Sequence, residues 1–239
     1  TRERLQPYLN SRSSAFVDWH PSERRMLIGT RFAETTQLHE LDRPLGMRRQ
    51  LTFYAEPVGG ALYRPTAPGQ LVLTRDEGGS ENHQIFLLDR SNGLTRRLSD
   101  GVHRHHSVRW STDGNRLIFM NNARNGRDSD LYLYDLATGT ERRLVDLEGS
   151  WGVLDWSRDG RRILLLNFVS AERSSLWLFE PETSTLRPLD RPDAPPTSYG
   201  NAMFSPDGQS IYALTDLGGE FQRLARYDLA PGLWTVLTS

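Results

Sequence analysis

A five-residue segment that ends in a tight turn recurs along the chain at a steady spacing. Its fifth residue falls at positions 23, 69, 114, 160 and 208, so successive copies lie 45 to 48 residues apart. A period this regular over 239 residues indicates one supersecondary unit repeated five times. Three copies read aromatic-Ser-x-Asp-Gly and two are degenerate: 110–114, 156–160 and 204–208, then 19–23 and 65–69.

Each repeat continues with two apolar segments and one polar segment. An almost unbroken apolar run follows the turn and is typical of a strand buried on both faces. A second run, rich in aromatic residues, follows a polar loop and fits a sheet that packs on another sheet. A short segment with basic residues then ends the repeat, as suits an outer edge strand. The two kinds of apolar run are 26–28, 71–73, 117–120, 163–166 and 211–214, then 38–41, 85–88, 131–134, 176–179 and 224–227.

Four antiparallel strands per repeat, with an aromatic residue near the end of the first strand, describe the blade of a β-propeller. The sequence therefore predicts an all-β chain of five four-stranded blades, in a single propeller domain or propeller fragment over residues 1–239. A helical solenoid is excluded because 20 glycines and 13 prolines interrupt the chain too often for long helices. The expected blades span about 14–52, 58–99, 105–145, 151–190 and 199–238.

Composition excludes several classes of partner. A formal net charge of -1 gives no electrostatic footprint for nucleic acid, and the recurring Arg-Arg pairs are interpreted as solvated strand faces. The longest apolar runs are too short to cross a membrane, and the chain shows no signal peptide. Without cysteine there are no disulfides. We expect a soluble protein of either the cytoplasm or the periplasm.

Any binding surface is expected on one face of the blades. In a four-strand meander the first and third turns share one face, and here these turns are stereotyped. The other face collects the loops between second and third strands and the inter-blade connections, which are longer and more varied. Two of these loops combine Gly-Gly with acids that either cap the loop or face a ligand cation such as a peptide amine. The candidate substrate-binding residues are Asp76, Glu77, Glu81, Asp216 and Glu220.

The other polar motifs predict no catalysis and no cofactor. The nearest approach to a hydrolase G-x-S-x-G is residues 148–152, where Glu148 stands in place of the first glycine. Asp128 and Asp130 are interpreted as loop-capping acids, because one such pair lacks the oxygens that calcium requires. The cluster of His103, His105 and His106 is not expected to bind metal, because adjacent histidines do not easily face one ion. Residues 192–196 are interpreted as an inter-blade linker.

Several segments resemble the N-terminal propeller of bacterial prolyl oligopeptidase-family serine peptidases. The blades alone, which are WD-like, are also similar to those of TolB-like propellers, and the Gly-Gly loops and the opening residues favour the peptidases. The resemblance covers essentially the whole chain. The segments that carry it are 8–12, 50–53, 73–86, 124–132 and 218–224.

The resemblance implies a larger protein. In that family a propeller, commonly of seven blades, restricts access of peptide substrates to a C-terminal α/β-hydrolase domain, whose catalytic Ser, Asp and His have no counterparts here. The first hypothesis is therefore a non-catalytic propeller that gates and docks peptides onto that hydrolase partner. Five blades from a larger ring would leave apolar faces bare, and homo-oligomerisation is one way to cover them.

Two alternatives stay open. One is a stand-alone TolB-like propeller that serves as a protein-binding scaffold. The other is a five-bladed glycan-active enzyme that uses Asp18 and Asp155, since two carboxylates suffice for glycoside chemistry. Both acids immediately precede a blade tryptophan, which favours a repeated structural role.

Overall fold

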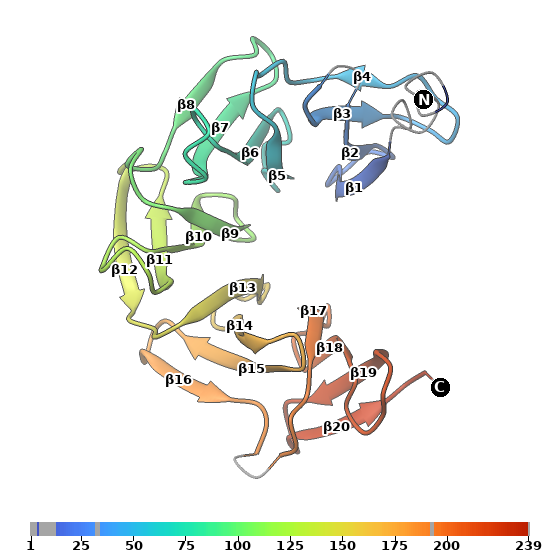
Figure 1. Cartoon of the computed structure of the whole chain (residues 1–239), viewed down its shortest axis with the longest axis vertical. Coiled ribbons are helices and arrows are strands. Elements are labelled where there is room, and N and C mark those ends of the chain that lie inside the picture. The colour runs from blue at the N-terminus through green and yellow to red at the C-terminus, as the bar shows by residue number, and fades with distance from the viewer. Residues whose placement is uncertain (1–3, 5–12, 32–33, 192–193, 239) are drawn as a thin grey trace. The chain divides into compact units, whose positions relative to one another are not determined.

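The computed structural model describes residues 4, 13–31, 34–191 and 194–238, in which twenty strands form five separate four-stranded sheets. Within each sheet the strands lie in sequence order and neighbouring strands are antiparallel (Figure 1). The prediction of an all-β chain of five four-stranded blades is confirmed.

The strand bounds follow the predicted apolar runs closely. Blades 1 and 2 contain β1 (Ser14–Trp19), β2 (Met26–Thr30), β3 (Gln37–Leu41), β4 (Arg49–Gln50), β5 (Val58–Tyr63), β6 (Gln70–Arg75), β7 (Gln84–Asp89) and β8 (Thr95–Arg97). Blades 3 to 5 contain β9 (His105–Trp110), β10 (Arg116–Asn121), β11 (Asp130–Asp135), β12 (Thr140–Val145), β13 (Ser150–Trp156), β14 (Ile163–Ser170), β15 (Arg173–Glu180), β16 (Thr185–Pro188), β17 (Tyr199–Phe204), β18 (Ser210–Thr215), β19 (Arg223–Asp228) and β20 (Leu233–Val236).

The Asp-Gly turn has a specific physical basis. In blade 4 the Ser157 hydroxyl donates to Asp159 Oδ1 at 2.6 Å, and the same carboxylate accepts the amide of Arg161 at 3.0 Å. Gly160 adopts a φ of +74°, which a residue with a Cβ adopts only with strain. The turn therefore needs serine, aspartate and glycine at fixed positions, which explains why this motif marks the repeat.

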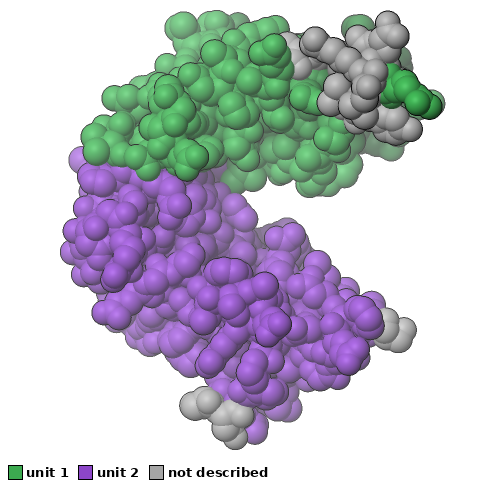
Figure 2. All heavy atoms as spheres, viewed as in Figure 1, with its two compact units in different colours: residues 1–102 green, residues 103–239 purple. Residues whose placement is uncertain are grey.

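The chain divides into two compact units, residues Thr1–Val102 and His103–Ser239 (Figure 2). Unit 1 contains blades 1 and 2, and unit 2 contains blades 3, 4 and 5. The single-domain assignment for residues 1–239 stays a prediction, and the two units are described separately below.

Within each unit the blades pack face to face through alternate residues of their strands. In unit 2, Ile118 and Met120 of blade 3 lie in one core cluster with Trp151 and Trp156 of blade 4. Leu164 of blade 4 belongs to a second cluster, together with the aromatic residues of blade 5. In unit 1, Leu27 and Leu38 of blade 1 pack with the apolar residues of blade 2. Because both faces of such a sheet are covered, its inner strands are apolar almost without interruption.

A carboxylate tether joins blades at two of these junctions. Asp155 of blade 4 accepts the amide of its own neighbour Trp156 and, at 2.8 Å, the amide of Phe204 in blade 5. Asp18 of blade 1 makes the same pair of bonds, to the amides of Trp19 and Tyr63. Burial raises the pKa of the Asp155 carboxyl. The predicted repeated structural role of these two aspartates is confirmed.

Candidate functional site

The loops that join second to third strands lie at the same end of the blades as the inter-blade connections, because each antiparallel hairpin reverses the chain. In unit 2 these loops span residues 122–129, 171–172 and 216–222. In unit 1 they span 31–36 and 76–83, and residues 32–33 of the first one lie outside the described residues. This loop end is where the sequence predicts a binding surface.

In the blade 2 loop, Asp76 and Glu77 are held by local contacts. Asp76 Oδ1 accepts the Ser80 hydroxyl at 2.7 Å, and this bond lowers the pKa of the Asp76 carboxyl. Glu77 forms ion pairs with Arg75 and Arg97, each at 3.1 Å. These two acids therefore order their own loop and strand ends, and their predicted role in substrate binding stays a prediction.

Glu81 ends the turn of the same loop. It is exposed and adopts a φ of +60°, and the preceding Gly78 and Gly79 also have positive φ. The sequence analysis expected these two glycines to permit a left-handed backbone, and both adopt that conformation. The left-handed conformation of Glu81 is strained, because a residue with a Cβ adopts it only at a cost in energy.

In the blade 5 loop, the two candidate acids have different surroundings. Asp216 Oδ1 accepts the amide of Ser198 at 2.7 Å and so links the loop to the residues that precede β17. Glu220 lies on the exposed tip of the loop. Asp76 and Asp216 belong to different units, so each loop is considered as a separate surface.

A partly open hollow of about 540 Å³ lies at the loop end of unit 2. Three segments contribute to it: the residue before β9, the loop between β10 and β11, and the connection from β12 to β13 together with the first residue of β13. Its volume is within the usual range of ligand-binding pockets. The lining residues are Arg104, Arg127, Asp128, Ser129, Glu148, Gly149 and Ser150.

An ion pair between the fully buried Asp130 and the partly exposed Arg124 holds the two sides of this hollow together. Asp130 has no exposed surface, and its carboxylate accepts Arg124 Nε at 2.8 Å and Arg124 Nη2 at 3.1 Å. The same guanidinium donates to the carbonyl of Leu147 at 2.8 Å, and the Leu147 amide donates back to Asp130 at 2.8 Å. Because both partners also bond Leu147, the loop and the connection are fixed to each other.

Asp128 forms the floor of the hollow. Its buried carboxylate accepts Asn125 Nδ2 at 2.8 Å, the Gly149 amide at 3.0 Å and Arg127 Nε at 3.2 Å. These bonds, first that from Asn125 and then that from Gly149, hold the pKa of Asp128 far below its usual range. The interpretation of Asp128 and Asp130 as loop-capping acids is confirmed.

The rim of the hollow carries groups that remain available for a ligand. Arg127 keeps 83% of its side chain exposed although it bonds Asp128. The Arg104 amide donates to Asn122 Oδ1 at 2.9 Å, which places this exposed residue beside the loop. Glu148 and Ser150 are exposed as well. These guanidinium, carboxylate and hydroxyl groups stand on a backbone that is already fixed, so a polar ligand does not have to order the loop when it binds.

The histidine cluster lies beneath this end of blade 3. His105 is fully buried, with Nδ1 2.8 Å from the carbonyl of His103 and Nε2 2.9 Å from Asn121 Nδ2. His106 Nε2 lies 3.1 Å from the hydroxyl of Ser129. Among the described residues no group of three or more His, Cys, Asp or Glu is placed to hold a metal ion. The histidines therefore support the blade 3 loop.

Sequence reasoning identified the loop end but not the hollow. The Gly-Gly pattern directed attention to the loops of blades 2 and 5, whereas the hollow uses the blade 3 loop. The spacing of Arg124, Asp128 and Asp130 around an apolar strand is the local signal, since a buried strand that begins with aspartate needs a cation nearby. Glu148 reaches the hollow because the connection that carries it is bonded to the blade 3 loop at Leu147 and Gly149, and it has no local sequence signature.

Comparisons with known proteins give the fold. No family model and no curated protein matches the chain. TolB from Acinetobacter baumannii is 20% identical over 95% of this chain, with a TM-score of 0.72. A structure from a study of two prolyl endopeptidases is 14% identical over 100% of this chain, and an oligogalacturonate lyase in complex with manganese is 13% identical over 95%, each with a TM-score of 0.73.

The chain has a TolB-like β-propeller fold, which it shares with neighbours of different function. It spans about half of the Acinetobacter TolB, at 54%, and 39% of the prolyl endopeptidase chain. Among the described residues we find no helix with the length and apolar character needed to span a membrane.

Proposed function

We propose that this propeller is a non-catalytic binding module that binds a polypeptide segment at the loop end of unit 2. The observation that carries the proposal is the hollow of about 540 Å³, which has a rigid frame and a rim of exposed charged groups. Arg104 and Arg127 would pair with carboxylates of the segment, and Glu148 with an ammonium or guanidinium. The exposed amide and carbonyl groups of an extended peptide would bond the Ser150 hydroxyl and the loop backbone.

Two finer functions share this binding step. In the first, the module is a TolB-like scaffold for a protein partner, which the likeness to TolB over 95% of the chain supports. In the second, it docks and gates peptides for an α/β-hydrolase domain, which the likeness to a prolyl endopeptidase over 100% of the chain supports. Sequencing the gene beyond the codon for Ser239 separates them, because only the second requires a downstream G-x-S-x-G with Asp and His.

The binding step is tested with a peptide selected from a random dodecapeptide library displayed on phage. A synthetic copy of the selected peptide is then titrated by isothermal calorimetry against wild type, Arg127→Gln and Glu148→Gln. We expect at least one of these variants to bind about tenfold more weakly, the loss of one charged contact. Tenfold equals about 1.4 kcal/mol.

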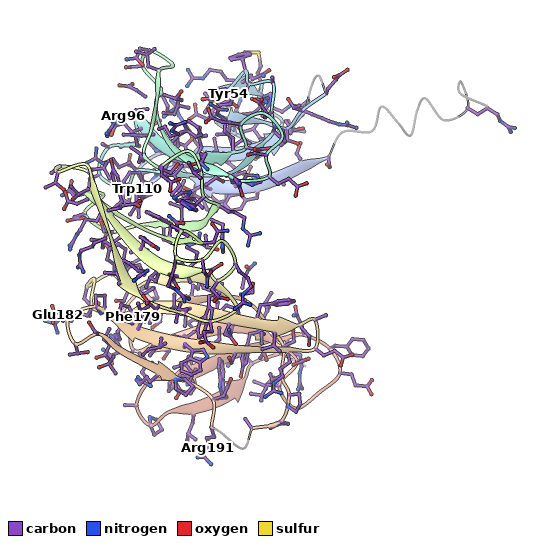
Figure 3. All side chains as sticks on the ribbon, turned by 60° about the vertical axis from the view of Figure 1, so that its left-hand side comes forward. Tyr54, Arg96, Trp110, Phe179, Glu182 and Arg191 are labelled. Carbon is purple, nitrogen blue, oxygen red and sulfur yellow. The ribbon has the colours of Figure 1, made fainter. Side chains whose placement is uncertain are left out.

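Matched controls remove the same charges from the opposite end of the blades. Arg161→Gln alters the exposed arginine of an Asp-Gly turn, and Glu182→Gln alters an exposed glutamate between β15 and β16. Figure 3 shows Glu182 at the margin of the sheet that contains Phe179. Both controls should bind like wild type. Equal affinity in all five proteins would contradict the proposal.

A further inference from the structure

The hairpin of β14 and β15 in blade 4 departs from its counterparts in blades 3 and 5. Each of its strands has eight residues, whereas β10, β11, β18 and β19 have six. It closes with a turn at residues 171–172, whereas the neighbouring blades have the longer loops 122–129 and 216–222. Blade 4 therefore extends regular strands into the loop end of unit 2.

One register position shows the departure most clearly. The eighth residue after the turn glycine is Asn122 in blade 3 and Asp216 in blade 5. Each of these side chains accepts the amide of the residue just before the first strand of its blade, Arg104 at 2.9 Å and Ser198 at 2.7 Å. In blade 4 the same position is Phe168, whose side chain cannot accept a hydrogen bond of this kind. An aromatic residue thus replaces a polar residue that joins two segments.

Two adjacent apolar side chains are exposed at this end of the hairpin. Phe168 is 50% exposed and Val169 is 60% exposed. Val169 is the extra residue of a bulge, because Phe168 pairs with Ser174 whereas Ser170 pairs with Arg173. A bulge interrupts the regular alternation of side chains between the two faces of a strand and re-aims a side chain. We call Phe168 and Val169 the blade 4 tip.

The blade 4 tip stands on a fixed base. Its strand partner Ser174 is buried, and the Ser174 amide donates to the carbonyl of Thr197 at 2.9 Å. The Ser174 hydroxyl accepts the amide of Tyr199 at 2.8 Å. These bonds attach the hairpin to the connection that leads into blade 5. A ligand that contacts the blade 4 tip therefore does not have to order it first.

The exposure of the blade 4 tip does not come from a bare blade face. Both faces of this sheet are covered within unit 2: Leu165 packs in a cluster with Ile118 of blade 3, and Leu164 in a cluster with Ala213 of blade 5. The blade 4 tip is also small. Two half-exposed side chains offer on the order of 200 Å², against about 800 Å² for each partner of a stable protein–protein interface. This area suits one side chain of a ligand better than the face of a folded protein.

The blade 4 tip adjoins the hollow. Ser150 lines the hollow, and it pairs with Phe168 in the register of β13 and β14. Directly paired residues of an antiparallel sheet project from the same face with Cβ atoms about 5 Å apart. An extended peptide advances by about 3.3 Å per residue. The peptide residue that reaches Phe168 is therefore one or two positions from the residue that contacts Ser150.

We propose that the blade 4 tip binds an apolar side chain of the polypeptide segment that occupies the hollow. The segment would then combine an acidic residue, paired with Arg104 or Arg127, with an apolar residue a few positions away that packs on Phe168 and Val169. This inference rests on the proposed function and narrows its ligand to acidic segments with an apolar anchor. The charged contact orients the segment, and the apolar contact selects among acidic segments.

The test is a double-mutant cycle by isothermal calorimetry with the selected dodecapeptide. Each apolar residue of the peptide is replaced by alanine in turn, and every peptide is titrated against wild type, Phe168→Ala and Leu233→Ala. Leu233 is a matched control, 51% exposed at the start of β20 and at the opposite end of the blades. We expect Phe168→Ala to bind the parent peptide about tenfold more weakly and Leu233→Ala to bind it like wild type. Val169→Ser should weaken binding about threefold.

The coupling between protein and peptide gives the decisive result. One alanine substitution in the peptide should cost about tenfold with wild type and almost nothing with Phe168→Ala, because the contact is then already lost. Equal costs with both proteins for every substitution would overturn the inference. So would full affinity of Phe168→Ala where Arg127→Gln or Glu148→Gln binds weakly, and in that case the proposed function stands. Full affinity of both hollow variants would overturn the proposed function and this inference with it.

Discussion

The blade 3 loop and the blade 2 loop occupy the same place in their repeats, yet acids stabilise them in different ways. In the blade 3 loop, Asp128 and Asp130 are buried and bond to the next inter-blade connection. In the blade 2 loop, Asp76 bonds a serine four residues away, and Glu81 is exposed. Acids in the first loop fix two segments to each other, whereas those in the second shape one turn. Only the first arrangement builds a preorganised hollow.

The largest effect is expected from Asp130→Ala. The change leaves Arg124 without its main partner and leaves the Leu147 amide without an acceptor. We expect a loss of about 3 kcal/mol in the free energy of unfolding, because a fully buried carboxylate is removed and both the Leu147 amide and the partly buried Arg124 lose their acceptor. Urea denaturation measures it. A loss below about 1 kcal/mol would mean that the frame does not depend on this pair.

Asp128→Asn should have a smaller effect that depends on pH. The folded-state pKa of Asp128 lies below its ordinary value of 3.8, so the ionised carboxylate stabilises the fold above that pH. This stabilisation is lost as the pH falls through the folded-state pKa. We expect Asp128→Asn to lower the melting temperature near neutral pH, and the difference from wild type to shrink as the pH falls below about 4. A difference that grows in acid would contradict the assignment.

Asp216→Ala tests the intermediate case in blade 5. This half-buried carboxylate accepts one amide, that of Ser198 at 2.7 Å. We expect a loss of about 1 kcal/mol, the usual net value of a single hydrogen bond. Differential scanning calorimetry provides the measurement, with Glu220→Ala on the exposed tip as the control. Equal losses in the two variants would mean that Asp216 stabilises the protein no more than the exposed Glu220 does.

The smallest effect, of opposite sign, is expected from Glu81→Gly. Glu81 has a φ of +60°, a conformation that glycine adopts without strain. The release of strain and the greater freedom of the unfolded chain partly cancel, so we expect a change between zero and about 1 kcal/mol in favour of folding. Urea denaturation would contradict this if the variant were clearly less stable, because Glu81 would then make a contact that the blade 2 loop needs.

The repeat made most of the fold predictable. Its turn depends on Ser157, Asp159 and Gly160, whose chemistry is local, so the motif can be read without knowing what packs around it. The apolar runs located the inner strands because both of their faces are covered. The division after Val102 was not predicted, since contacts between blades depend on side chains distant in sequence.

The candidate site was predictable only in part. Strand order alone places the variable loops at one end, and Asp128 and Asp130 were correctly interpreted as capping acids. The hollow depends on Glu148 and Arg104, which come to the blade 3 loop through Leu147, Gly149 and Asn122. Such contacts join segments that lie 17 to 21 residues apart in the sequence, so the local pattern around each residue does not reveal them.

Hydrogen–deuterium exchange of the chain with and without the selected dodecapeptide tests the central claim most directly. If the hollow binds a polypeptide segment, amides in residues 122–129 and 146–150 should become more protected, whereas the Asp-Gly turn at 157–162 should not change. Protection confined to that turn, or to strands outside the loop end of unit 2, would contradict the account.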